Sequence, residues 1–290
     1  MTLHLGESAG IHLADVHGVT VKGGTVSGFE PACSSNGGIV GNQVVHNGPF
    51  DGIGVLGLGS DHNRLEANDV EANTDDNASG VLGGGAGVIV NPFLEAEDVR
   101  RGESLIGNDV VNNVIRNNTS SGSSNLSNLY ATISGNLVEH NGFRANGEVS
   151  DPGNGIGVQH LFMAQPDTHD LVEQNLVRNN AYDGIQVTSE ANRMIANTST
   201  GNGDLDLADY NDFSGGLPCD SNVWRNNIWG PYLATSLGSY YPECVTKGGS
   251  GPRPSGAFSQ PLAAARQDAG QGPTGRRRSP EPADSRRTGS

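Results

Sequence analysis

Three side chains in the second half of the sequence have the chemistry to transfer a proton or to hold a developing charge: His160, Arg178 and Asp183. Each also has a structural explanation. His160 could begin a loop, Arg178 could be a surface charge on a strand, and Asp183 could be the turn residue that precedes a glycine. We name these three residues as the candidate catalytic residues, and both explanations stay open at this point.

Carboxylates recur at short intervals just downstream, at Asp204, Asp206 and Asp209, followed by Asp212. Calcium takes several oxygen ligands, and a run of aspartates can supply them. We therefore predict that Asp204, Asp206 and Asp209 hold calcium if the chain binds a metal, and we predict no other cofactor. The alternative is an acidic loop that is solvated.

These side chains belong to a repeat, in which an asparagine, any residue, an aliphatic residue, two further residues and a second asparagine follow one another. One row of asparagines comprises Asn42, Asn68, Asn113, Asn136, Asn175, Asn197 and Asn227, and a second row lies five residues later at Asn47, Asn73, Asn118, Asn141, Asn180 and Asn202. Intervals along the first row are 26, 45, 23, 39, 22 and 30 residues. The shortest interval, 22 residues, predicts one coil of a solenoid. Longer intervals predict inserted loops, and the interval of 45 residues could also contain an additional coil.

A third short strand follows the second asparagine, as in DGIGV from Asp51, NGIGV from Asn154 and DGIQV from Asp183. Three short strands per coil of about 22 residues predict an all-β, three-faced parallel solenoid of about seven to nine coils, with one strand per face in each coil. Because side chains alternate along a strand, the two aliphatic residues of each such segment should point inward. The outward row of this face is then Gly54, Ile89, Gly157, Gln186 and Asp206.

The asparagine rows should lie at the corners of the coils, where a buried amide can satisfy the backbone of the turn and hydrogen-bond to the asparagine one coil away. We predict that the role of Asn68, Asn113, Asn136, Asn175 and Asn197 is structural. Replacing one of them with alanine should cost roughly 1–3 kcal/mol. Long insertions flank the third strand of the coil. If the protein has a functional site, we expect it on the outer surface of that strand.

Charge is distributed unevenly along the chain. The net charge of −15 divides into −19 for residues 1–247 and +4 for residues 248–290. An acidic body repels the phosphates of nucleic acid, so we expect no nucleic acid partner. No apolar run approaches the roughly 18 residues that cross a bilayer, so we expect no membrane span. We expect a monomer.

Three cysteines, Cys33, Cys219 and Cys244, make an odd number, and two of them flank the end of the repeats. We predict a disulfide between Cys219 and Cys244, which requires an oxidising compartment, whereas the alternative is three free thiols. The predicted domains are a β-helix over residues 1–218, which could lack its N-terminal part, a C-terminal coil and cap over residues 219–247, and a disordered tail rich in glycine, proline and arginine over residues 248–290. The start of the sequence shows no signal peptide.

At its N-x-V-x-x-N and D-G-I-x-V segments, between about residues 10 and 230, the chain resembles the right-handed parallel β-helix repeat superfamily. Pectate lyases, alginate lyases, mannuronan C5-epimerases and copper-accessory proteins belong to this superfamily. Similarity is greatest to the secreted members that are defined only by their repeats. The resemblance implies a right-handed parallel β-helix that is secreted, periplasmic or on the cell surface, with a polysaccharide, acidic or neutral, as the partner.

This chain matches the catalytic residues of these enzymes less completely than it matches their repeat. Where the epimerases have aspartate and histidine on the D-G-I strand, this chain has Gly157 and Gln159 in one coil and Gln186 and Thr188 in another. Two functions therefore remain open: a polysaccharide lyase or epimerase, and a β-helix without catalytic activity that binds glycans or serves as a scaffold. A copper-accessory function is a weaker third alternative, since the 3 methionines and 8 histidines form no cluster.

Overall fold

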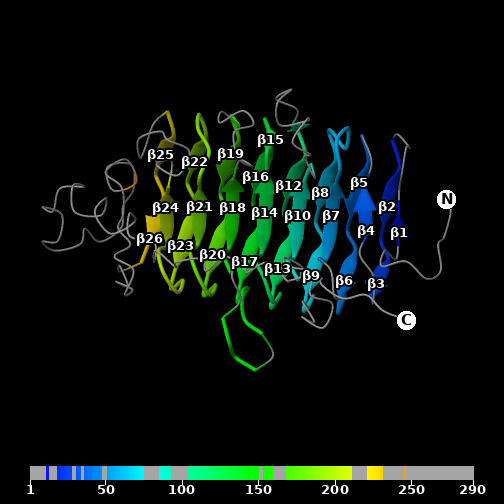
Figure 1. The fold of residues 1–290 in the computed structure, drawn as a ribbon, viewed down its shortest axis with the longest axis horizontal. Coiled ribbons are helices and arrows are strands. Elements are labelled where there is room, and N and C mark those ends of the chain that lie inside the picture. The colour runs from blue at the N-terminus through cyan, green and yellow to red at the C-terminus, as the bar shows by residue number, and fades with distance from the viewer. Residues whose placement is uncertain are drawn as a thin grey trace, which may run out of the picture. The chain divides into compact units, whose positions relative to one another are not determined.

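The computed structural model describes residues 11–12, 18–27, 31–33, 36–47, 51–74, 85–92, 104–144, 146–149, 153–159, 168–210, 221–230 and 245. Within these ranges, three eight-stranded sheets run along the axis of a solenoid (Figure 1), and their neighbouring strands pair in parallel. This is a right-handed parallel β-helix, as the repeat and the resemblance predict. The side chains of residues 11–12, 26–27 and 31–33 are not described.

We number the sheets in the order in which they are discussed. Sheet 1 contains β1 (Ile11–His12), β4 (Pro31–Cys33), β7 (Ile53–Leu56), β10 (Val88–Asn91), β14 (Ser123–Leu126), β18 (Ile156–Gln159), β21 (Ile185–Val187) and β24 (Leu207–Asp209). Sheet 2 contains β2 (Thr20–Lys22), β5 (Gly38–Val40), β8 (Arg64–Glu66), β12 (Asp109–Val111), β16 (Thr132–Ser134), β19 (Leu171–Glu173), β22 (Arg193–Ile195) and β25 (Val223–Arg225). Sheet 3 contains β3 (Thr25–Ser27), β6 (Gln43–Val45), β9 (Asp69–Glu71), β13 (Val114–Arg116), β17 (Leu137–Glu139), β20 (Leu176–Arg178), β23 (Thr198–Thr200) and β26 (Ile228–Trp229). A smaller pair joins β11 (Leu105–Ile106) to β15 (Asn128–Leu129).

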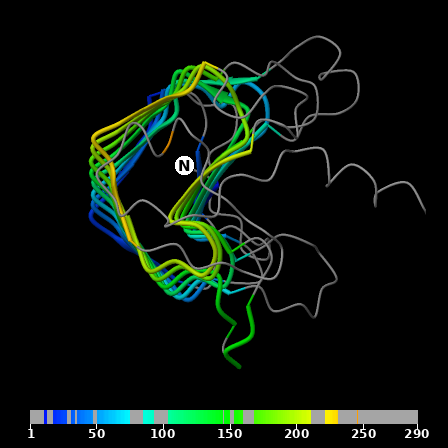
Figure 2. The ribbon, with the colours of Figure 1, turned by 90° about the vertical axis from the view of Figure 1, so that its left-hand side faces the viewer.

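Each coil visits sheet 2, sheet 3 and sheet 1 in that order, and seven coils have all three of their strands within the described residues. Figure 2 shows the coils superimposed in an end-on view. The connection from sheet 2 to sheet 3 is two residues long in every coil, whereas the connections on either side of sheet 1 vary in length. Residues 72–87 and 140–155 lead into sheet 1, and residues 160–170 and 210–222 lead out of it. The insertions therefore flank sheet 1, as the sequence predicts.

The two predicted rows of asparagines form continuous ladders at the corners. In the first ladder the side-chain oxygen of Asn113 accepts hydrogen bonds from the backbone nitrogen and Nδ2 of Asn68, at 2.9 and 3.0 Å, and this pattern repeats from coil to coil. In the second ladder Asn141 Oδ1 accepts from Nδ2 of Asn118 at 2.9 Å. The five asparagines predicted to be structural are at most 2% exposed.

The long interval between Asn68 and Asn113 contains no additional coil. These two asparagines hydrogen-bond directly, and β8 pairs with β12. Its 45 residues are one coil that carries insertions on both sides of sheet 1, so the expectation that the interval could contain an additional coil is wrong.

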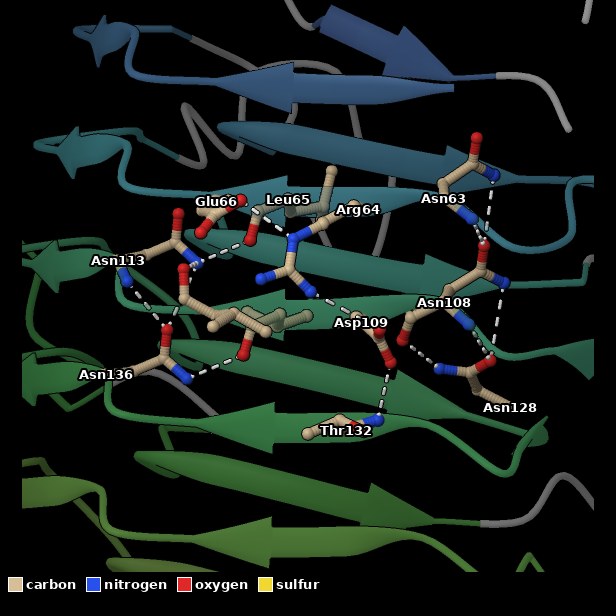
Figure 3. A network of polar contacts seen from close by, with 12 residues as sticks. Asn63, Arg64, Leu65, Glu66, Asn108, Asp109, Asn113, Asn128, Thr132 and Asn136 are labelled. Atoms are coloured by element: carbon tan, nitrogen blue, oxygen red, sulfur yellow. Dashed lines mark hydrogen bonds and ion pairs between the residues drawn. The ribbon is translucent and has the colours of Figure 1, made fainter. Parts of the chain in front are cut away.

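The structure also contains a third ladder, at the corner between sheets 1 and 2, which the sequence analysis did not identify. Asn63 Nδ2 donates to Asn108 Oδ1 at 3.0 Å, and Asn108 Nδ2 donates to Asn128 Oδ1 at 3.3 Å (Figure 3). Further along, Asp170 occupies the position of an asparagine: its Oδ1 accepts from Ala131 N at 2.8 Å. The repeat in the sequence already contains most of this row, since Asn63, Asn108, Asn192 and Asn222 each lie five residues before an asparagine of the first row.

The residue just before each ladder position adopts a left-handed backbone conformation. It is often not glycine, as at Ala67, Ala72, Gln174 and Ala196, where φ lies between 54° and 55°. The stacked amide thus fixes the corner, and the preceding residue adapts to it. The glycine before the isoleucine of these sheet 1 segments is needed for a different reason, which is lack of space. At Gly155 a Cβ would lie 2.4 Å from a methyl carbon of Val177 and 2.8 Å from a ladder amide.

A column of aliphatic side chains fills the interior. The inward residues of sheet 1 are buried as predicted, and they pack in one cluster with those of the other sheets, including Ile53, Val55, Ile156, Val158, Ile185 and Val187. Trp224 and Trp229, which the sequence places in a C-terminal cap, belong to this cluster, and they pair with Met194 and Ser199 of the preceding coil. The side chains of Cys33, Cys219 and Cys244 lie outside the described residues, so the disulfide stays a prediction.

Candidate functional site

The outer surface of sheet 1 carries a cluster of amide side chains over its last coils. Gln186 lies at the centre, on β21. Its Oε1 accepts from Asn154 Nδ2 at 2.9 Å and from Gln159 Nε2 at 2.5 Å. Next to Gln186, in register on β18, Gly157 has no side chain, and the Gln159 side chain extends across it. We call Asn154, Gln159 and Gln186 the amide cluster.

Asp183 lies beside this cluster, in the turn that precedes β21. Its Oδ2 accepts from Gln186 Nε2 at 3.1 Å, and its Oδ1 accepts from Leu205 N at 3.0 Å. Burial raises the pKa of Asp183 to about 7, and the neighbouring charge of Asp204 adds to the rise, whereas the hydrogen bonds to Leu205, Gln186 and Tyr210 oppose it. The carboxyl group is therefore close to half protonated at neutral pH, and either form contacts the amide cluster.

Asp183 also has a structural role, and Asp51 has the same role in its own coil. Asp51 Oδ1 accepts from Ala86 N at 2.7 Å, as Asp183 Oδ1 accepts from Leu205 N, so both carboxylates bind the backbone of the next coil. The expectation that aspartate is a turn residue in D-G-I thus agrees with the structure. Asp183 differs from Asp51 in its second oxygen, which contacts Gln186.

Within the described structure, neither of the other two candidate catalytic residues is placed beside Asp183. Arg178 lies on β20 in sheet 3, where its Nε donates to Glu139 Oε2 at 2.7 Å, as in the surface-charge alternative. His160 lies outside the described residues. The amide cluster is therefore accompanied by one titratable candidate, Asp183, in the part of the chain that the structure describes.

The three candidate calcium ligands have other partners. Asp206 does not lie in the outward row of sheet 1, as the sequence analysis expected, because Ala208 pairs with Gln186 there. Instead Asp206 Oδ1 accepts from the backbone and side-chain nitrogens of Asn202 at 3.1 and 2.8 Å and so terminates the second ladder. Its Oδ2 accepts from Gly230 N. Burial raises the pKa of Asp206.

Asp209 points into the interior, where Oδ2 accepts from Trp224 Nε1 at 2.9 Å and from Asn222 Nδ2 at 3.2 Å. Asp204 is half-buried next to Asp183. Among the described residues, no group of three histidine, cysteine or acidic side chains is arranged to hold a metal ion. This arrangement does not fit calcium, so no chemical step is assigned to a metal.

Gln186, Gln159 and Asn154 were not candidates in the sequence analysis, which noted the glutamines only as substitutions for the epimerases' acidic and histidine groups. The sequence did contain a pattern that could have identified them, because Gln159 and Gln186 both occupy outward-facing positions on neighbouring D-G-I strands. The contacts of Gln186 with Gln159 and Asn154 could not be predicted from the repeat alone, because they cross from one coil to the next, whereas Gln186 contacts Asp183 within one coil.

Comparisons with known proteins agree with this architecture. The fold is similar to that of the pectate lyase Pel9A, with a TM-score of 0.53 and 17% sequence identity over 77% of this chain and 51% of the other. This chain thus spans about half the length of that protein. A second similar structure is the Dettilon tailspike protein gp208, with a TM-score of 0.42, 14% identity, and 73% and 42% of the two chains covered.

No protein-family model matches the sequence, and no curated protein sequence is significantly similar to it. The similarity to solved structures and the strand pairing together define the class, a right-handed parallel β-helix. Within the described ranges, no helix is long and apolar enough to cross a membrane.

Proposed function

We propose that this protein binds an extracellular polysaccharide along the outer surface of sheet 1, with the amide cluster contacting the sugar hydroxyls. The observation that carries the proposal is the linked set of Asn154, Gln159 and Gln186 on the outer side of sheet 1, joined to the buried carboxyl group of Asp183. Amide side chains both donate and accept hydrogen bonds, as sugar hydroxyls do. A few polar groups held in fixed positions are typical of a ligand site.

The surface around the amide cluster is consistent with a long ligand. Sheet 1 is parallel over successive coils, and Ser124 and Gly157 keep its outward row low on the side of the cluster towards β14, whereas Ile89 extends from the row one coil further on. The insertions on both sides of sheet 1 begin and end next to this surface. The pectate lyase with a similar fold supports the choice of a polysaccharide as the ligand class. Such polymers are extracellular. An extracellular location also agrees with the oxidising compartment that the predicted disulfide requires.

Binding can be tested by electrophoresis through gels that contain alginate, polygalacturonate, hyaluronan or xylan. We expect at least one polysaccharide to retard the protein, and we expect the double variant Gln159→Ala, Gln186→Ala to lose at least tenfold in affinity. The matched control is Arg193→Ala, an exposed residue on sheet 2, which should bind like the wild type within twofold. If none of the polysaccharides retards the wild type, or if the control loses as much as the double variant, the proposal is wrong.

A second candidate function, polysaccharide lyase or C5-epimerase activity, is favoured by Asp183. A carboxyl group with a pKa of about 7 can both accept and donate a proton near neutral pH, which is what a general acid or base requires. Incubating the protein with each acidic polysaccharide, with and without calcium, tests this: a lyase releases unsaturated sugars, and an epimerase exchanges the C5 proton with deuterated solvent. Activity that Asp183→Asn abolishes would support the candidate. Neither product from any of the three acidic glycans would exclude it and leave the binding proposal in place.

A further inference from the structure

An exposed aromatic pair lies at the corner between sheets 1 and 2. The rings of Tyr130 and His169 are stacked, with centroids 5.2 Å apart and planes inclined by 11°. Tyr130 is 61% exposed, the largest value among the exposed hydrophobic side chains of the described structure. The two residues belong to consecutive coils, and Tyr130 N donates to Thr168 O at 2.8 Å. The stack is therefore built by the spacing of the coils and lies outside the core.

The corner itself does not require aromatic residues. Tyr130 and His169 have φ values of 58° and 55°, and the equivalent residues of other coils, His62, Gly107, Ala191 and Ser221, also have positive φ. Glycine, alanine and serine thus satisfy the same turn. The positive φ of Tyr130 follows from the corner, as it does at His62, so what the turn leaves unexplained is the identity of the side chain. Packing does not explain it either, because the phenol is mostly in solvent.

The aromatic pair is close to the amide cluster along the chain and across the coils. Tyr130 follows β14 by four residues, and the last residue of β14, Leu126, pairs in register with Gln159. Four residues span at most about 13 Å. The backbone of Tyr130 therefore lies within about 13 Å of that of Leu126, the residue next to Gln159 on sheet 1. Asn128 and Thr132, labelled in Figure 3, bracket Tyr130 in sequence: Asn128 lies on β15 and Thr132 begins β16 of sheet 2.

We infer that Tyr130 and His169 form a second subsite, in which the face of the Tyr130 ring stacks on the apolar C–H face of a pyranose ring of the same polysaccharide. This inference rests on the proposed function. The amide cluster supplies hydrogen bonds to hydroxyl groups, which lie at the edge of a sugar ring, whereas an aromatic face supplies apolar contact to the face of the ring. His169 holds the phenol in place from the next coil. An uncharged sugar face is also compatible with the acidic body, which would repel nucleic acid.

The test is Tyr130→Ala beside Tyr130→Phe, measured by the same gel electrophoresis in the polysaccharide that retards the wild type. Alanine occurs at positive φ elsewhere at the corners of this protein, as at Ala191, so the variant should fold; circular dichroism checks this. We expect Tyr130→Ala to weaken binding about five- to tenfold, and Tyr130→Phe, which keeps the ring, to stay within twofold. Proton NMR of a bound oligosaccharide should show upfield-shifted ring protons with the wild type and none with Tyr130→Ala.

The possible failures are distinguishable. If Tyr130→Ala binds like the wild type while Gln159→Ala, Gln186→Ala loses affinity, the aromatic subsite is wrong and the proposed function stands. Equal losses in Tyr130→Ala and Tyr130→Phe would mean that the hydroxyl group, and not the ring face, makes the contact, which overturns the stacking. If no polysaccharide binds the wild type, both inferences fail together.

Discussion

The asparagine ladder makes a quantitative prediction at Asn175, which lies in the interior of the first ladder and is 2% exposed. Its Oδ1 accepts from the backbone nitrogen and Nδ2 of Asn136, each at 3.0 Å. Its Nδ2 donates to Ile133 O at 2.8 Å and to Asn197 Oδ1 at 3.0 Å. Asn175→Ala removes all four hydrogen bonds without changing the backbone.

Some of the groups that hydrogen-bond to the Asn175 side chain keep another hydrogen-bond partner in the variant. Asn136 Nδ2 still donates to Val110 O, and Asn197 Oδ1 still accepts from the backbone nitrogen of Asn175. The backbone N–H of Asn136 loses the acceptor to which it donates, and it is buried. A buried group left unsatisfied costs about 1–3 kcal/mol, and the three weakened contacts add to it. We therefore expect the free energy of unfolding to fall by about 2–4 kcal/mol.

Urea unfolding followed by circular dichroism measures this loss, and hydrogen exchange locates it, because the Asn136 amide should exchange faster than its neighbours. The matched control is Asn226→Ala, an exposed corner asparagine with φ of 57°, which should change stability by less than about 0.5 kcal/mol since alanine occupies the same position at Ala196. Equal effects of the two substitutions, or unchanged protection of the Asn136 amide, would refute the view that the ladder stabilises the coils.

Three further predictions concern buried carboxyl groups. Because the folded-state pKa of Asp183 is raised to about 7, the folded state binds the proton more tightly than the unfolded state. The contribution of this group to stability should therefore be fully present below about pH 4 and should be lost as the pH rises through 7, by up to about 4 kcal/mol; the difference between wild type and Asp183→Asn in urea unfolding at several pH values should trace that loss. Burial also raises the pKa of Asp170, well above its ordinary value, at a ladder position where other coils have asparagine. Asp170→Asn should therefore stabilise the protein at pH 7 and not at pH 3, and thermal denaturation at the two pH values checks this, with equal stabilisation at both as the contrary result. Asp209→Ala should lower stability by about 1–3 kcal/mol and shift the tryptophan emission, because Trp224 Nε1 loses its acceptor; an unchanged emission spectrum would argue against the contact.

Much of the fold followed from the sequence because one local pattern specifies each coil. An asparagine five residues from the next sets the two-residue turn and the strand of sheet 3, and the alternation of aliphatic residues sets which side faces inward, as at Val70 and Val138. Stacking then repeats the same contacts along the axis, so local and global preferences agree. The third ladder was not recognised as a row because Asp170 replaces an asparagine in it and Asn128 does not keep the five-residue offset from the first row.

The site was less accessible to sequence reasoning. Asp183 was a candidate because a carboxyl group can transfer a proton, but its pKa depends on burial and on Leu205 and Asp204, which the next coil supplies. Arg178 was a candidate by type alone, and the fold turns it to sheet 3, towards Glu139.

The sequence by itself determined the coil, its three faces and the residues that line the interior, because these depend on alternation and turn chemistry within about 22 residues. The tertiary structure alone decided which polar side chains are partners. Gln186 contacts Gln159, Asp206 accepts from Gly230, and Tyr130 stacks on His169, since each contact joins residues that only the stacking of coils brings together.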